Sequence, residues 1–243
     1  MVLRIGLTLL SLSLLASCGG GGSALLEKPA VQSARPESRR HQRNRSRQPK
    51  GQAGQFDFYV LALSWSPGFC ATPAGQRDDL QCGPQRHFAF VLHGLWPQYE
   101  KSGWPQNCTT GAPDGAVVKT MLDIMPSTRL VQHEWEKHGT CSGLSAQDYF
   151  EEAREAFQKV KIPEAYRAPL KQITVNPEEM RRAFTAANPE FGEQGFAVKC
   201  TNNGRFLQEV RACFTKDLDG RACNAQVLRD ACRSEAVIMR PVR

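Results

Sequence analysis

Eight cysteines between residues 70 and 232 constrain the fold of this chain more than any other feature. The chain has 243 residues and nine cysteines, and the ninth, Cys18, stands far upstream of the others. An even set of eight favours disulfide bonds and an exported protein, because thiols stay reduced in the cytosol. Zinc is the alternative, but no C-x-x-C pair occurs in the chain. We therefore expect a disulfide-stabilised domain with no metal and no cofactor.

The spacing suggests two of the four disulfides. Cys213 and Cys223 are symmetric about Leu218, which lies in a turn sequence, so they can face each other across a hairpin. Cys200 and Cys232 would then pair outside them. The spacing leaves the partners of the remaining four cysteines open: Cys70, Cys82, Cys108 and Cys141.

The N-terminus has the pattern of an export signal. An apolar run of twelve residues, 5–16, follows a short basic start. It is too short to span a bilayer and is typical of a signal peptide. The run ends Leu15-Ala16-Ser17-Cys18, which resembles a bacterial lipobox and implies cleavage before Cys18 and lipidation of that cysteine. An ordinary secretory signal with an incidental cysteine is the alternative.

These features predict a signal peptide over residues 1–17 and a basic, flexible tether over residues 18–55. The tether is rich in Gly, Ser, Gln and Arg and has few apolar residues to bury. We expect an exported monomer of the periplasm or cell envelope, attached to the membrane only through lipid on Cys18. If that cysteine is not lipidated, the protein would be periplasmic or extracellular and soluble.

The net charge of +7 is confined to this N-terminal segment. Residues 1–55 hold nine of the 31 basic and two of the 24 acidic side chains, so residues 56–243 carry 22 of each. A basic protein usually suggests nucleic acid or an anionic membrane as a partner. Because the predicted domain is neutral, its function has to be inferred from local sites.

Residues 56–243 mix strands and helices without a regular alternation, which favours an α+β fold. A mostly antiparallel central sheet packed with helices is expected. The first strand, 56–65, is nearly all apolar and should be buried on both faces. A second strand should end at Gly94, with His93 at its end and Leu92 on the opposite face. Helices are predicted over 116–125, 129–141, 145–163 and 176–188, and strands with short turns from residue 196 onward.

Three of the five histidines lie in two short segments that are rich in distinctive residues. One segment is Phe90-Val91-Leu92-His93-Gly94-Leu95-Trp96-Pro97, and the other runs His133-Glu134-Trp135-Glu136-Lys137-His138-Gly139-Thr140-Cys141. On a helix at about 100° per residue, the second segment places a carboxylate, an ammonium group and an imidazole on one face. Those residues are Glu134, Lys137 and His138, with Cys141 beside them.

Two other interpretations fit the second segment alone. A zinc hydrolase of the H-E-x-x-H type needs histidines four residues apart, whereas His133 and His138 are five apart and diverge on a helix. An amphipathic helix with ordinary surface ion pairs is the other possibility.

Taken together, the two segments resemble the two signature motifs of the ribonuclease T2 family. The first matches F-x-x-H-G-L-W-P, and the second matches H-E-W-x-K-H-G-x-C. The 45-residue separation of His93 and His138 is also similar, as is the following segment Trp104-Pro105-Gln106-Asn107-Cys108. The resemblance covers the predicted domain and none of residues 1–55.

The resemblance implies a metal-independent endoribonuclease acting on single-stranded RNA. The ribose 2′-OH would attack the adjacent phosphorus, leaving a 2′,3′-cyclic phosphate. His138 would be the base and His93 the acid, Glu134 would orient His138 or assist its proton transfer, and Lys137 would stabilise the phosphorane. His133 matches an additional phosphate-binding histidine of the family.

Trp96 matches the base-stacking tryptophan of the family, which implies low base specificity. A core tryptophan is the alternative for this residue. Gln98 and Ser64 stand where many members carry Asp and Gln, so the resemblance leaves the base preference open. A catalytically silent, membrane-tethered binding protein on the same fold is the rival function, although all four catalytic residues are present.

Overall fold

The computed structural model describes residues 50–201 and 203–242. The predicted signal peptide, Cys18 and the tether up to residue 49 lie outside the described residues. The segment 50–55, which we assigned to the tether, is hydrogen-bonded to the domain. The Lys50 and Gln106 backbones exchange two hydrogen bonds, and the Gly54 N–H donates to the Cys141 carbonyl. The domain therefore extends at least to Lys50.

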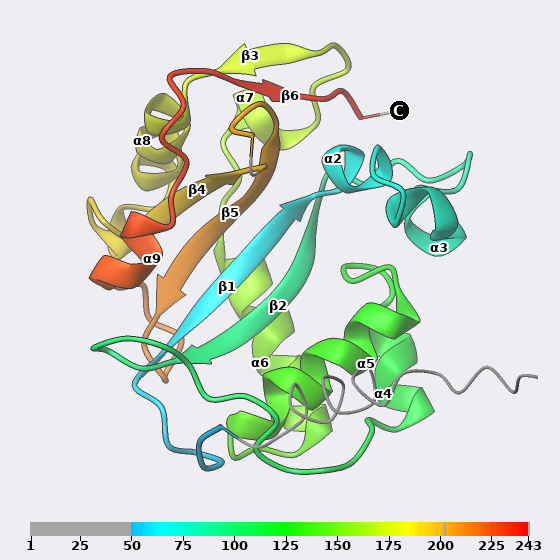
Figure 1. Cartoon of the computed structure of the whole chain (residues 1–243), viewed down its shortest axis with the longest axis vertical. Coiled ribbons are helices and arrows are strands. Elements are labelled where there is room, and N and C mark those ends of the chain that lie inside the picture. Colours follow the sequence, from blue (N-terminus) through cyan, green and yellow to red (C-terminus); the bar gives the residue numbers. More distant parts are fainter. Residues whose placement is uncertain (1–49, 202, 243) are drawn as a thin grey trace, which may run out of the picture. The chain divides into compact units, whose positions relative to one another are not determined.

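The core of the domain is an antiparallel sheet of four strands in the order β2-β1-β5-β4 (Figure 1). The strands are β1 (Phe58–Trp65), β2 (Phe90–Gln98), β4 (Phe196–Cys200) and β5 (Leu207–Phe214). A second sheet pairs β3 (Ile173–Val175) with β6 (Val237–Met239), also antiparallel. The α+β class with an antiparallel central sheet, expected from the sequence, is confirmed.

Eight α-helices surround the sheets in the part of the chain that the structure describes. They are α2 (Ser66–Cys70), α3 (Asp79–Cys82), α4 (Gly115–Met121), α5 (Thr128–Lys137), α6 (Ala146–Lys159), α7 (Glu164–Arg167), α8 (Pro177–Ala187) and α9 (Ala225–Arg229). Three short 3-10 turns lie at Gly75–Arg77, Gly139–Cys141 and Pro189–Phe191. None of the helices among the described residues is long and apolar enough to cross a membrane.

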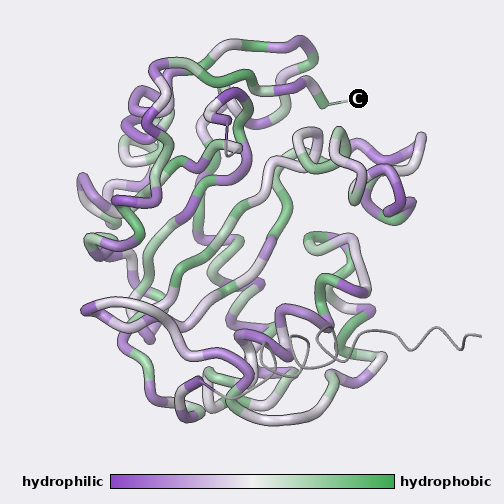
Figure 2. The backbone as a smooth tube through the Cα atoms, in the orientation of Figure 1, coloured by the Kyte–Doolittle hydropathy of each residue, from purple (hydrophilic) through white to green (hydrophobic). Residues whose placement is uncertain are grey.

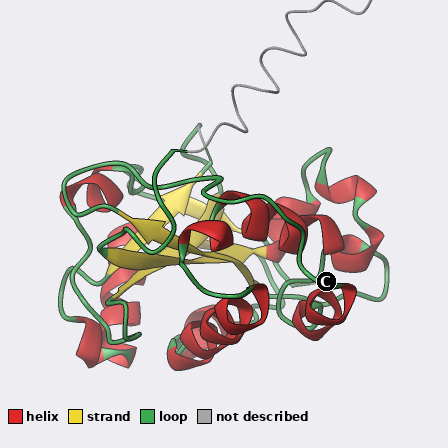
Figure 3. Ribbon diagram, turned by 90° about the horizontal axis from the view of Figure 1, so that it is seen from below, coloured by secondary structure: helices red, strands yellow, loops and turns green. Residues whose placement is uncertain are grey.

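Strand β1 is mostly hydrophobic along its length (Figure 2) and pairs with β2 along one edge and β5 along the other. Its two faces are buried, as the apolar run predicts, because a side-chain cluster packs on each of them. Tyr59, Leu61 and Leu63 belong to the larger core, which includes residues of α6 and α8. Phe58 and Val60 face the other way, into a smaller cluster with Val227 of α9. The longer helices gather along one side of the sheet, and the other side is covered mostly by loops (Figure 3).

Side-chain caps explain where the two clearest helices begin. The Ser145 hydroxyl accepts a hydrogen bond from the Asp148 N–H at the start of α6. The Asn176 carboxamide accepts from the backbone of Glu178 and Glu179 at the start of α8, and Pro177 fits the first turn. Both starts were predicted from the sequence.

Several predicted boundaries were wrong. The helix predicted over 116–125 spans 115–121, the one over 129–141 ends at Lys137, and α6 ends before Pro163. The second strand continues through Gly94 to Gln98 because Gly94 pairs with Ala62 across the sheet. The region after Phe196 contains α9, which an Asn224 side-chain cap begins. These ends are set by pairing and capping contacts that hydrophobic periodicity does not record.

The eight cysteines of the domain form four disulfides: Cys70–Cys82, Cys108–Cys141, Cys200–Cys232 and Cys213–Cys223. The last two are the pairs that the spacing suggested. The Cys213–Cys223 bond spans ten residues around the turn at Leu218, which has a positive φ of 59°.

Two of these disulfides close loops of almost equal size, 33 and 32 residues, and should stabilise the fold similarly. We predict that Cys108→Ser with Cys141→Ser, and Cys200→Ser with Cys232→Ser, each lower the free energy of unfolding by about 2–4 kcal/mol, because the unfolded chain gains entropy. Urea unfolding of the oxidised proteins measures this. A midpoint equal to that of the parent in either double variant would contradict the prediction.

Candidate active site

Strand β2 presents His93 and Trp96 on the same face of the sheet. Residues three apart in a regular strand point to opposite faces. Here the pairing register with β1 shifts between Leu92 and Gly94, and His93 is the extra residue of a β-bulge. The bulge re-aims the side chain and keeps both residues on the face away from the main core.

Helix α5 and the residue after it supply the other polar groups. His133, Glu134 and Lys137 lie in the last two turns, and His138 is the C-cap, with φ −118° and ψ −49°. All four line one cavity. A shared helical face was predicted for Glu134, Lys137 and His138, whereas His133 was not assigned to that face. Cys141 was expected on this face too, but it is buried in the following 3-10 turn.

The C-terminal end of α5 is held by hydrogen bonds and a disulfide to Asn107 and Cys108, in the segment that follows β2. The Asn107 N–H donates to the Lys137 carbonyl at 3.0 Å, and the Cys108 N–H donates to the Thr140 hydroxyl at 3.1 Å. The disulfide from Cys108 to Cys141 closes the same contact. The position of His138 is therefore fixed by covalent and hydrogen bonds outside its own helix.

A glycine follows each of the two central histidines for a steric reason. A Cβ at Gly94 would collide with the Glu134 carboxylate and with Trp96 Nε1. A Cβ at Gly139 would come within 2.8 Å of the Tyr149 ring. The backbone approaches these side chains so closely that only glycine fits at either position.

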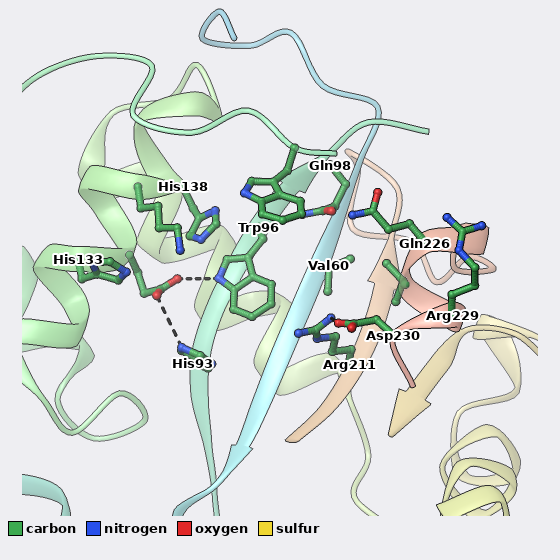
Figure 4. A pocket seen from close by; sticks show the side chains of 14 residues that line it. Val60, His93, Trp96, Gln98, His133, His138, Arg211, Gln226, Arg229 and Asp230 are labelled. Carbon is green, nitrogen blue, oxygen red and sulfur yellow. Dashed lines mark hydrogen bonds and ion pairs between the residues drawn. The ribbon is translucent and has the colours of Figure 1, made fainter. Parts of the chain in front are cut away.

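The cavity has a volume of about 520 Å³ and lies over the sheet face that carries Val60 and Trp96. Figure 4 shows the histidines on one side of Trp96 and the α9 residues on the other. The lining residues are Val60, His93, Trp96, Gln98, Trp104, His133, Glu134, Lys137, His138, Arg211, Gln226, Val227, Arg229 and Asp230. Trp96 is half-buried and lines the cavity, so it is not a core tryptophan.

Two carboxylates hold the His93 ring. Its Nδ1 lies 3.1 Å from Glu209 Oε2, and its Nε2 lies 3.8 Å from Glu134 Oε1. Glu134 Oε2 accepts a hydrogen bond of 2.6 Å from Trp96 Nε1. We expected Glu134 to orient His138 or to assist its proton transfer, but its side-chain contacts go to His93 and Trp96.

The surroundings of His93 favour its charged form. Burial alone would lower its pKa, but the hydrogen bond to Glu209 and the charges of Glu134 and Glu209 outweigh burial and the charge of Arg211. The pKa of His93 is therefore raised above its usual value.

The surroundings of His138 favour its neutral form. Burial lowers its pKa well below the usual value, and the charge of Lys137 adds to the effect. Its Nδ1 is buried without a hydrogen-bond partner among the described residues. The two central histidines are thus shifted in opposite directions, which is the arrangement that a paired acid and base require.

Glu134 and His133 also have shifted pKa values. Burial raises the pKa of Glu134, which is 1% exposed, although His93, Trp96 and Lys137 partly oppose it. Burial, followed by the charges of Lys137 and His93, lowers the pKa of His133. His133 is therefore mostly neutral near pH 7, so that it would offer a hydrogen bond rather than a full charge.

The described residues contain no group of three or more His, Cys, Asp or Glu side chains placed to bind a metal ion. His133 and His138 both line the cavity, but the described residues place no third ligand with them in a group that could hold a zinc ion.

Sequence reasoning missed several residues of this site. Glu209 and Arg211 come from β5, and Gln226, Arg229 and Asp230 come from or follow α9. A usable signal was present in β5, where the charged residues Glu209 and Arg211 alternate with buried Val210 and Ala212. Nothing in the sequence places α9 at this cavity.

A second cavity of about 470 Å³ borders His93 on its other side. It is lined by Ser64, Gly68, Phe69, Thr72, Asp78, Gln81, Val91, His93, Ser127, Leu130, Thr201, Leu207, Gln208 and Glu209. His93 thus stands between two hollows, each large enough for part of an extended ligand.

Sequence comparison places this site in a known family. Residues 56–223 match the model of the Ribonuclease T2 family. A protein named "Ribonuclease" from Aeromonas hydrophila is 36% identical over 200 residues, which cover 81% of this chain and 91% of that protein. Ribonuclease I of Escherichia coli is 27% identical over 208 residues, covering 68% and 78%.

Solved structures share the fold of this chain. Trichomaglin, described as a novel S-like ribonuclease, superposes with a TM-score of 0.61 at 22% identity and covers 78% of this chain and all of that one. RNase NT, solved in complex with 5′-AMP, gives a TM-score of 0.56 at 26% identity and covers 69% of this chain and 91% of its own.

We predict that NMR titration of the native protein will show His93 above and His138 below the ordinary histidine pKa of about 6.5. The carboxylates of Glu209 and Glu134 raise the pKa of His93, whereas burial and the charge of Lys137 lower the pKa of His138. The same titration in urea is the control and should bring both to the ordinary value. The reverse order in the native protein would contradict the assignment.

Proposed function

The chain belongs to the ribonuclease T2 family, and we propose that it cleaves single-stranded RNA by transphosphorylation, leaving 2′,3′-cyclic phosphate ends. The observation that carries this proposal is the pair His93 and His138. They line one cavity with opposite pKa shifts. Transphosphorylation needs one group to remove a proton and another to supply one at the same pH.

In the first half of the reaction, neutral His138 takes the proton of the ribose 2′-OH. The 2′-oxygen then forms a bond to the adjacent phosphorus, and negative charge builds up on the phosphoryl oxygens. Lys137 lines the same cavity and can stabilise this charge. The charge of Lys137 also helps to keep His138 neutral, so one cation supports both roles.

In the second half, protonated His93 gives its proton to the 5′-oxygen as the bond from phosphorus to that oxygen breaks. The products are a 2′,3′-cyclic phosphate and a free 5′-OH, so protons and bonds balance. Glu134 supports the charged form of His93 through its own charge and stays aligned through the hydrogen bond from Trp96. The reaction needs no metal-activated water, because the nucleophile belongs to the substrate.

We assign His133 to phosphate binding and Trp96 to base stacking. His133 lies at the cavity wall, where its ring is only partly covered, and the charges of Lys137 and His93 act on it. Trp96 and the exposed Trp104 both line the cavity, and stacking on indole rings tolerates any base. Low base specificity follows. The cavity beyond His93 can take the nucleotide on the other side of the scissile phosphate.

We further propose that the protein is exported and held in the cell envelope by lipid on Cys18. The support is the apolar run followed by Leu15-Ala16-Ser17-Cys18, together with a domain whose other eight cysteines are all paired. Disulfides persist in oxidising compartments such as the bacterial periplasm.

We predict that the purified protein cleaves single-stranded RNA in excess EDTA and that mass spectrometry finds cyclic phosphate ends. His93→Ala and His138→Ala should each lower kcat by at least about 10²–10⁴-fold, because each removes a proton-transfer group. His87→Ala is the control, since His87 is exposed and lines neither active-site cavity.

Each alternative predicts a different result in this experiment. Activity lost in EDTA would favour metal chemistry, and a folded protein without cleavage would favour a silent binding protein. Full turnover in either histidine variant would overturn the assignment of acid and base.

We predict that the full chain, expressed in a Gram-negative host, incorporates radiolabelled palmitate. Cys18→Ser should abolish the label and release the protein from the membrane fraction, because the proposed anchor is attached to that thiol. Ser17→Ala is the matched control and should keep the label. Equal labelling of the Cys18 variant and the parent would rule out the lipid anchor.

A further inference from the structure

A second buried carboxylate, Glu209, contacts His93 on the ring nitrogen that faces away from Glu134. Glu209 is 1% exposed and lies on β5, where it pairs with Ser64 of the neighbouring strand β1. Its Oε2 lies 3.1 Å from His93 Nδ1. The β-bulge at His93 and the alternation of β5 bring these residues, 116 positions apart in sequence, to the same sheet face.

Glu209 is held in its ionised form by Arg211, two residues along the same strand. Arg211 Nε donates to Glu209 Oε1 at 2.8 Å, and Arg211 also binds Asp230 at 2.8 Å. Asp230 in turn pairs with Lys199 at 2.6 Å. Burial would raise the pKa of Glu209, but the hydrogen bond from His93 and the charge of Arg211 lower it overall.

An ionised carboxylate only accepts hydrogen bonds, so the nitrogen of His93 that faces Glu209 must carry a proton. The other nitrogen, Nε2, is then the one that gains and loses a proton during the reaction. A partner carboxylate of this kind fixes the tautomer and the ring orientation of a catalytic histidine and stabilises its charged form.

Arg211 also connects this pair to the wall of the cavity. Its guanidinium lies over the Trp96 ring, 5.3 Å from the centroid, and Trp96 donates to Glu134. The His93 ring is therefore contacted by Trp96 of β2, Glu209 of β5 and Glu134 of α5. Other charged or titratable groups that act on His93 or line the two cavities it borders are His133, Lys137, His138, Arg229 and Asp78.

We propose that Glu209 is a positioning residue of the ribonuclease reaction, which holds His93 with Nε2 toward the leaving oxygen and keeps the ring protonated as the acid. This inference rests on the proposed transphosphorylation. Arg211 has a supporting role, because it keeps Glu209 from taking up the proton that His93 must hold.

The test is the pH profile of the full-length Glu209→Gln variant. Glutamine keeps the shape and an acceptor oxygen but loses the charge. The alkaline limb of kcat/KM reports the acid group and should move to lower pH. We expect kcat to fall about 10–100-fold, as for other residues that orient a site residue through a hydrogen bond, with KM nearly unchanged.

Two comparison variants separate positioning from general destabilisation. Glu209→Asp keeps the charge at a greater distance, so it should lower kcat while the alkaline limb stays near that of the parent. Glu178→Gln is the matched control, because Glu178 is also an arginine-paired carboxylate but lies on α8 and lines neither cavity. Its pH profile should equal that of the parent.

One measurement on the parent protein does not depend on the folding of any variant. ¹⁵N NMR should find neutral His93, above its pKa, with the proton on Nδ1. The tautomer with the proton on Nε2 would overturn the proposal, and so would a folded Glu209→Gln enzyme with unchanged kcat and alkaline limb. A parent that forms no cyclic phosphate would instead refute the proposed function.

Discussion

A single inserted residue in strand β2 determines how the site is assembled. The bulge at His93 lets Leu92 and Leu95, three residues apart, both face the main core, while His93 and Trp96 both face the cavity. Without the bulge, residues three apart would point to opposite faces of the sheet. One leucine would then face the cavity, and either His93 or Trp96 would face the main core. The bulge lies in the pairing of β2 with β1, and β1 is in turn paired along its other edge with β5. All residues of β1 except Ser64 are buried.

The site has to hold two acidic groups that water scarcely reaches. Glu134 and Glu209 are each 1% exposed, and burial of an isolated charge is strongly unfavourable. The two carboxyl groups have different hydrogen-bond partners, and their pKa values shift in opposite directions. Glu209 is paired with His93 and Arg211 and keeps its charge, whereas Glu134 has Trp96 as its close donor and its pKa is raised. The protonated form of His93 is thus stabilised by a carboxylate at each ring nitrogen, Glu209 at Nδ1 and Glu134 at Nε2.

The placement of charge along the chain explains how a neutral domain can act on a polyanion. The excess positive charge of the sequence lies in residues 1–55, whereas residues 56–243 carry 22 acidic and 22 basic side chains. Within the domain, cationic and imidazole side chains converge on one cavity, where Lys137, Arg211 and Arg229 join the histidines. A local concentration of positive charge suffices for a scissile phosphate, because interactions between exposed charges are screened beyond about 10 Å.

The sequence alone determined the family, the α+β class, two disulfides and the group of side chains that surrounds the cavity. Local patterns record such features, since motif spacing, helical periodicity and capping residues act within a few positions. The tertiary structure decided that Glu134 contacts His93 and Trp96, that β2 continues past Gly94, and that Glu209 and Arg211 lie at the site. These facts depend on strand register and on contacts between residues far apart in sequence, above all that of His93 with Glu209, 116 positions away. No local pattern encodes such contacts, because they exist only once β5 has paired with β1.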